Sequence, residues 1–99
     1  MSKAAAKRGA KLLDFTIKHW FLLVDERFLE QRLIGNCVIG QLFCGFDRGL
    51  TALGIPFDKW DYYGFDVAVT KKVEAYDKLT VAWKAEVVKR KKKYYERCN

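Results

Sequence analysis

The 99-residue sequence has only one histidine, one proline and three cysteines. An odd cysteine count without regular spacing argues against a disulfide framework. The single histidine, His19, has no second ligand at the spacing of a zinc site. Neither a Gly-x-Gly-x-x-Gly motif nor a Gly-Lys-Ser/Thr phosphate loop is present. We therefore expect no catalytic residue, metal, cofactor or small-molecule substrate.

Long hydrophobic runs are also missing. The apolar stretch 33–57 is interrupted by Asp47 and Arg48, each costing about 2.5–3.5 kcal/mol at the centre of a bilayer. A spanning helix needs about 20 predominantly apolar residues, so a transmembrane helix is disfavoured, although contact of 33–57 with lipid stays open. The stretch is instead rich in glycine, and small residues at four-residue spacing allow helices to pack closely. Its expected packing residues against a partner are Gly40, Cys44, Gly45 and Gly49.

Hydrophobic residues make up 51% of the chain and aromatic residues 15%. A chain this short buries only about 60–70% of the surface that it exposes when unfolded. Part of this apolar surface is therefore expected to contact a partner or lipid. We place Trp60, Tyr63 and Trp83 at such an interface, because aromatic side chains dominate interface energetics.

The scarcity of proline and the three-and-four spacing of apolar residues predict an all-α fold. We expect one domain, 1–99, with two or three helices at about 11–34, 36–53 and 66–96 in an extended, hairpin-like arrangement. The second helix is either continuous or broken near Gly45–Gly49. In the third, Thr80 is the weak point of an otherwise apolar stripe. A basic tail, 1–10, and a basic extension, 89–99, flank this domain.

The net charge of +7 is concentrated at the two ends of the chain. Basic ends suit an anionic surface, which could be phospholipid headgroups, RNA or an acidic protein face. The alternative is that they form a solvated surface that keeps the protein soluble. The expected anion-contacting residues are Lys3, Lys7, Arg8, Lys11, Lys89, Arg90, Lys91, Lys92 and Lys93.

The first residues are rich in alanine and basic, with no acidic residue before Asp14, as in a mitochondrial targeting segment. The overall composition is similar in type to that of the supernumerary subunits of respiratory complexes and ATP synthase, without a matched motif. We therefore expect a non-catalytic accessory subunit of a mitochondrial inner-membrane complex, with other protein subunits as partners. The alternatives are a small RNA-associated protein, such as a mitochondrial ribosomal component, and a peripheral membrane protein.

Overall fold

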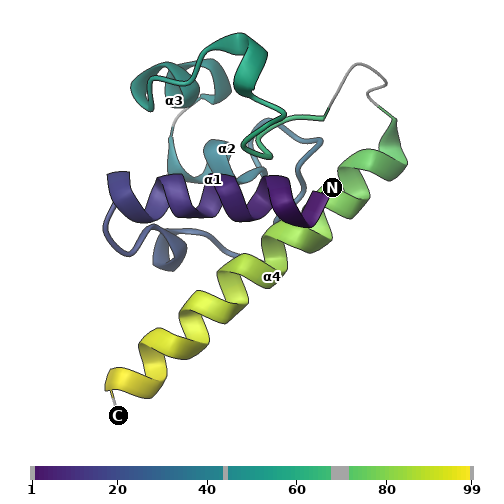
Figure 1. Ribbon diagram of the computed structural model, residues 1–99. Helices are drawn as coiled ribbons and strands as arrows, with labels where there is room; N and C mark the ends of the chain where they lie inside the picture. The colour runs from purple at the N-terminus through teal and green to yellow at the C-terminus, as the bar shows by residue number, and fades with distance from the viewer. Residues whose placement is uncertain (1, 44, 68–71, 99) are drawn as a thin grey trace.

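The computed structural model describes residues 2–43, 45–67 and 72–98, and all regular elements among them are helical. Two 3-10 helices, η1 (Trp20–Leu23) and η2 (Phe57–Lys59), lie among the four α-helices shown in Figure 1. These α-helices are α1 (Ser2–Thr16), α2 (Val38–Leu42), α3 (Phe46–Ala52) and α4 (Val73–Cys98). The expected all-α class with a long C-terminal helix is confirmed.

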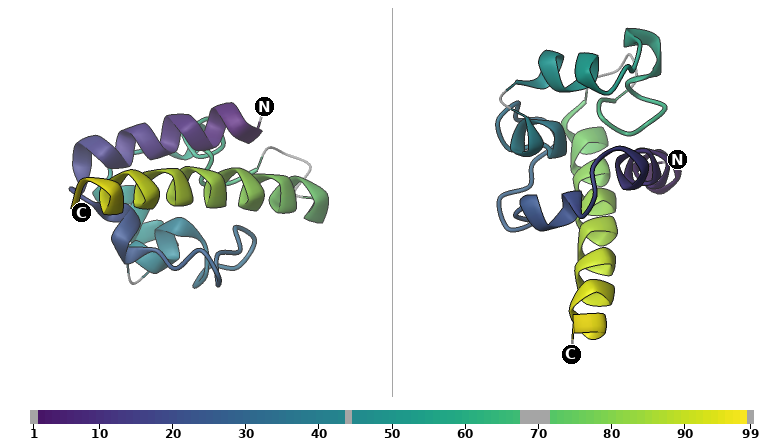
Figure 2. Two further views of the ribbon diagram at one scale, coloured as in Figure 1. Left: turned by 90° about the horizontal axis from the view of Figure 1, so that it is seen from below. Right: turned by 90° about the vertical axis from the view of Figure 1, so that its left-hand side faces the viewer.

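Helix α4 is the central element of the fold. Helix α1 packs along one side of it, and the segment from η1 to α2 lies on the other side (Figure 2). Three side chains of α4, Leu79, Trp83 and Val87, are buried between these two layers. The expected hairpin-like arrangement is therefore more compact than an open hairpin, and the C-terminal turns of α4 project from the globule in the right view of Figure 2.

Helix α1 can approach α4 closely because its inward face is made of small residues. Ala6, Gly9, Ala10 and Leu13 recur at three-and-four spacing and are all buried. A Cβ atom at Gly9 would lie 2.1 Å from the Tyr63 carbonyl oxygen, so only glycine fits there. The basic start of the chain, expected as a tail over 1–10, is thus part of a packed helix.

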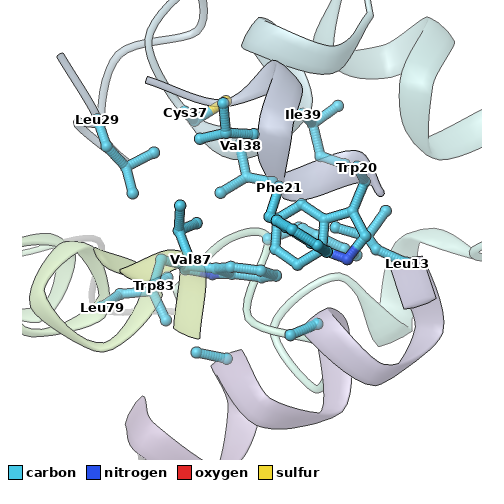
Figure 3. Close-up of a cluster of buried hydrophobic side chains, with 14 of the residues drawn as sticks. Leu13, Trp20, Phe21, Leu29, Cys37, Val38, Ile39, Leu79, Trp83 and Val87 are labelled. Atoms are coloured by element: carbon cyan, nitrogen blue, oxygen red, sulfur yellow. The ribbon is translucent and has the colours of Figure 1, made fainter. Parts of the chain in front are cut away.

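The core is built around two tryptophans (Figure 3). Trp20 and Trp83 are fully buried and meet edge to face, with ring centroids 5.9 Å apart. Phe65 stacks on Trp83 at 5.4 Å, and the Trp83 indole N–H donates to the Gly64 carbonyl. Trp83, which was expected at an interface, therefore lies in the interior of the chain.

The first helix begins and ends earlier than expected: it starts at Ser2 instead of residue 11 and ends at Thr16 instead of residue 34. The Thr16 hydroxyl donates to the Leu12 carbonyl at 2.9 Å, and His19 adopts a left-handed conformation with φ 57° and ψ 33°. This reversal directs the following chain around α4. Apolar residues at helical spacing, including Trp20 and Val24, are then buried from a 3-10 helix and turns.

Two glutamine side chains replace backbone hydrogen bonds that a continuous helix would have made. The Gln41 amide oxygen accepts from the Asp25 N–H at 2.7 Å, and its amide nitrogen donates to the Asp25 carbonyl. The Gln31 amide oxygen accepts from the Val38 N–H at 2.8 Å. Because these groups are paired by side chains, residues 24–37 can lie against α4 without being helical.

The second predicted helix is two short helices, α2 and α3, so the expectation of a broken helix is the correct one. The third helix was predicted from residue 66, but α4 begins at Val73; residues 68–71 lie outside the described part of the chain. Thr80 is not a weak point. Its hydroxyl accepts a buried hydrogen bond from the Gln31 N–H at 2.9 Å.

Candidate functional site

The two basic ends of the chain meet in space. Lys3 and Lys7 lie one turn apart on α1, and they face Lys78 and Lys89 of α4 across an open groove of about 730 Å³. Helix α1 lies against α4, alongside it in the left view of Figure 2 and seen nearly end-on in the right view, which brings these distant parts of the sequence together. The groove between them combines both predicted anion-contacting segments.

Small apolar side chains form the floor of this α1–α4 groove. Ala4 comes from α1, and Val81, Ala82 and Ala85 come from α4. Val81 is the most prominent of them, with 68% of its surface exposed. An apolar floor that is open to solvent is the kind of surface that proteins use to bind partners.

The rim of the groove is predominantly cationic. Of its charged residues, Lys3, Lys7 and Lys78 have no ion-pair partner among residues 2–43, 45–67 and 72–98. The two carboxylates at the rim belong to Asp77 and Glu86. Glu86 is already engaged by Arg90, so the lysines dominate the field that an approaching ligand meets.

Arg90, a predicted anion-contacting residue that does not line the groove, is charge-paired within the chain. Its guanidinium donates to both carboxylate oxygens of Asp14, at 3.0 and 2.9 Å, and to Glu86 at 2.7 Å. Partial burial opposes ionisation of Asp14, but hydrogen bonds from Arg90 and Trp20 outweigh it and keep the Asp14 pKa below its usual value. Arg90 therefore fastens the end of α1 to α4, and its charge is compensated.

Two further predicted anion-contacting residues also have roles within the fold. The Arg8 Nε donates to the Tyr62 carbonyl at 2.7 Å, and the guanidinium lies 4.0 Å from the centre of the Tyr62 ring. Lys91 donates to the Val24 carbonyl and pairs with Glu26. The hydrogen bond from Lys91 lowers the pKa of Glu26. Arg8, Arg90 and Lys91 thus stabilise the chain itself.

The remaining predicted cationic residues are exposed to solvent and available to a partner. They are Lys3, Lys7, Lys11, Lys89, Lys92 and Lys93. The structure brings three of them, Lys3, Lys7 and Lys89, to the α1–α4 groove.

The glycines of 33–57 were expected to pack against a partner, but two of them pack within the chain. A Cβ atom at Gly40 would meet the Ile34 carbonyl oxygen at 1.8 Å, and one at Gly49 would meet the Ile39 side chain at 2.4 Å. Gly45 is the N-cap of α3 and has space around it. Cys44 lies outside the described residues. Gly40 and Gly49 therefore allow the turns around α2 and α3 to close, which explains their presence without a second molecule.

The three aromatic residues expected at an interface differ in their accessibility. Trp83 is fully buried in the core, so its assignment to a partner surface is corrected. Trp60 and Tyr63 are half-buried. The Trp60 indole N–H donates to the Ile55 carbonyl at 3.2 Å, and its ring meets Phe46 at 5.1 Å. Only the outer edges of Trp60 and Tyr63 remain accessible.

Cys37 has a structural role at the start of α2. Its sulfur accepts a hydrogen bond from the Gly40 N–H at 3.3 Å and so acts as an N-cap. The side chain is buried, and burial raises the pKa of the thiol. A thiol with a raised pKa stays protonated near neutral pH, which disfavours nucleophilic chemistry.

Two searches of the described residues bear on metal and membrane binding. Within residues 2–43, 45–67 and 72–98, no three histidine, cysteine or acidic side chains lie close enough together to hold a metal ion. Over the same residues, no helix combines the length and apolar composition that crossing a bilayer requires. In the stretch 33–57 the longest helix is α3, with seven residues.

Sequence reasoning missed half of the groove. Ala4, Lys78, Val81 and Ala85 were not recognised as functional candidates, although the last three recur with Lys89 at three-and-four spacing. This second stripe on α4 was obscured because its apolar members are small. A search for two stripes on one helix, one large and one small, would have found it.

Comparisons of the chain with protein-family models, with curated proteins and with solved structures each returned no match. The function proposed below accordingly depends on the shape, charge and packing of the described residues.

Proposed function

We propose that this chain is a non-catalytic subunit of a larger assembly and that a neighbouring subunit docks in the α1–α4 groove. The observation that carries this proposal is an exposed apolar floor enclosed by lysines that lack carboxylate partners among the described residues. A chain that folds by itself has no need to leave Val81 open beside such a rim. Docking would bury the floor and compensate the charges at once.

The expected occupant is an acidic amphipathic helix of a partner protein. A helix fits because α1 and α4 already form two walls of a three-helix packing arrangement, with alanines that permit close approach. Acidic residues fit because the rim presents Lys3, Lys7 and Lys78, and electrostatic complementarity sets orientation and association rate. The apolar face of such a helix would lie on Val81 and Ala85.

The host that we propose is a mitochondrial inner-membrane complex, of the respiratory or ATP synthase kind. Support comes from the basic, alanine-rich start, whose alanines Ala5, Ala6 and Ala10 are buried while Lys3 and Lys7 face outward. Anionic phospholipid headgroups are a further partner class for the exposed lysines at the projecting end of α4. Both parts of this proposal require direct tests.

The test compares two substitutions of exposed valines on the same helix. Val81→Glu places a carboxylate on the floor of the groove, whereas Val88→Glu makes the same change at a position that is 48% exposed and does not line it. Burying a valine contributes about 1.5–3 kcal/mol, so Val81→Glu should weaken docking at least tenfold. Neither substitution should disturb folding, because both side chains are largely exposed.

The tagged variants would be purified in mild detergent from mitochondria and from whole cells, with and without nuclease. We expect the native chain and Val88→Glu to recover the same membrane complex, and Val81→Glu to lose it. Photo-crosslinking from position 81 should then reach an acidic helical segment of one subunit. Equal recovery by both variants would refute docking in the groove. Recovery of RNA that disappears with nuclease would instead establish the RNA-associated alternative.

A further inference from the structure

A second hollow, of about 580 Å³, lies next to the C-terminal half of α4. His19 and Phe21 contribute one wall, and Tyr94 contributes another. The rings of these three residues meet edge to face, with His19 5.1 Å from Tyr94 and 5.9 Å from Phe21. The hollow thus has a defined aromatic wall and is not only a gap between charged side chains.

A row of cations from α4 also lines the hollow. Lys89, Lys93 and Arg97 follow one another at four-residue spacing, which places successive residues about 6 Å apart along the helix. Lys93 and Arg97 are exposed and have no ion-pair partner in the described part of the chain. Lys89 lies 3.5 Å from Glu86, a weak contact that leaves it largely exposed.

The other charged groups at the hollow compensate each other. Asp14 is its one lining carboxylate, and Asp14 is held by Arg90, as described above. The charge that a ligand would meet therefore comes from Lys89, Lys93 and Arg97. Three cations that converge on one hollow favour an anion with more than one negative charge.

His19 is the second, independent observation. Among residues 2–43, 45–67 and 72–98 it is the only residue other than glycine with a positive φ. Such a conformation is unfavourable for a residue with a Cβ atom, and strained residues gather at functional sites. Its side chain makes no capping hydrogen bond to η1. Glycine would adopt this backbone more readily, so the strain is retained together with an imidazole that packs on Phe21 and Tyr94 and lines the hollow.

We propose that this hollow binds a phosphate-bearing ligand, with Lys93 and Arg97 contacting the phosphates and His19 donating a hydrogen bond from its imidazole. The aromatic wall of Phe21 and Tyr94 contacts the non-phosphate part of the ligand. The phosphates belong either to a soluble polyphosphorylated molecule or to a phospholipid headgroup, because both present the same chemistry. This site shares Lys89 with the α1–α4 groove but is otherwise separate from it, and a chain that fails to dock a partner can still bind here.

Two probes distinguish the sources of phosphate. Tripolyphosphate is titrated calorimetrically into the full chain at physiological salt. In a second experiment, phosphatidylcholine vesicles with and without cardiolipin are sedimented in the presence of the full chain, and the bound chain is measured in the pellet. Saturable binding of tripolyphosphate supports a soluble ligand, and binding only to cardiolipin vesicles supports a headgroup. Binding to neither probe overturns the proposal.

Lys93→Ala and Lys92→Ala form a matched pair, since both remove one exposed lysine from the same turn and only Lys93 lines the hollow. We expect Lys93→Ala to weaken binding at least tenfold and Lys92→Ala to weaken it less than twofold. Equal effects would show that the ligand senses only the overall charge, which overturns the site.

His19→Gly separates ligand binding from folding. Glycine removes the strain of the left-handed backbone at residue 19, and this gain should offset the loss of the imidazole contacts. We therefore expect a melting temperature within about 3 °C of that of the native chain. Binding of the effective probe should nevertheless fall about tenfold. Unchanged binding by this folded variant would remove His19 from the site and overturn the proposal as stated.

Discussion

Substitution of Gly9 by alanine tests whether the basic start of the chain is a packed helix. A Cβ atom at this position would lie 2.1 Å from the Tyr63 carbonyl oxygen and 2.7 Å from Cζ2 of the Trp83 ring. Both distances are shorter than any tolerated contact, and neither neighbour is the free end of a flexible side chain. Helix α1 would have to move away from both Tyr63 and Trp83, which loosens contacts along its whole length.

The magnitude follows from two opposing effects. Overpacking of a well-packed core costs about 1–3 kcal/mol, and this collision with backbone lies at the upper end. Alanine in place of glycine inside a helix returns about 1 kcal/mol. The net loss for Gly9→Ala is therefore about 2 kcal/mol, which lowers the melting temperature of a domain of this size by about 8–16 °C.

The assay is thermal and urea unfolding followed by circular dichroism, with Gly35→Ala as the matched control. Gly35 is exposed, and a Cβ atom there would meet nothing within 4 Å. We expect this control to lie within about 0.5 kcal/mol of the native chain. If Gly9→Ala unfolds at the same temperature as the native chain, α1 does not pack against Tyr63 and Trp83, and the α1–α4 groove does not exist.

Two other predictions concern buried and charge-paired contacts of α4. Thr80→Val removes the acceptor of the Gln31 N–H inside the core and should lower the free energy of unfolding in urea by about 1–3 kcal/mol. Thr80→Ser keeps the hydroxyl and should lower it less. A Thr80→Val variant as stable as the native chain would contradict this hydrogen bond. Asp14→Asn tests the ion pair with Arg90. Because the folded-state pKa of Asp14 lies below the usual 3.8, its carboxylate stabilises the fold above that pH, and this contribution disappears as the pH falls through the folded-state pKa. The stability difference between the native chain and Asp14→Asn should thus shrink from pH 7 to pH 3, and a constant difference would show that the charge of Asp14 is unimportant.

Local sequence patterns were sufficient for the fold class and for the last helix. Scarce proline and a 4-3 apolar repeat through Thr80, Trp83 and Val87 indicate a helix whether or not its partners are known. Its N-terminal boundary was predicted too early because the apolar repeat extends back to Val69 in the sequence and Asp66 is a suitable cap before it. The small-residue stripe of α1 is also present in the sequence. Alanine is only weakly hydrophobic, however, and the basic composition of this segment favoured its interpretation as a mitochondrial targeting segment.

The end of the first helix could not be predicted from local sequence. Apolar residues continue at helical spacing past residue 16, and no proline marks a stop. The chain leaves the helix because Trp20 is better buried against Trp83, 63 positions along the chain, than on a continuing helix. Tertiary packing decides such a boundary, and helix propensity is a weak prior against it. The second hollow, which His19 lines, depends on this turn, so the phosphate site proposed there could not be predicted from local sequence either.

The division of the basic run 89–93 into structural and exposed cations follows from helix periodicity. The apolar stripe of α4 runs through Trp83 and Val87, and its next members by the same spacing are Arg90 and Tyr94. Arg90 is accordingly only 14% exposed, and a cation so placed needs carboxylate partners to offset the cost of its desolvation. Positions 89, 92 and 93 fall outside the stripe, where no such partner is required. Substitutions at Arg90 should therefore mainly reduce the stability of the fold, whereas substitutions at the exposed lysines should mainly reduce binding. The net charge of the run, which counts all five cations alike, does not show this difference.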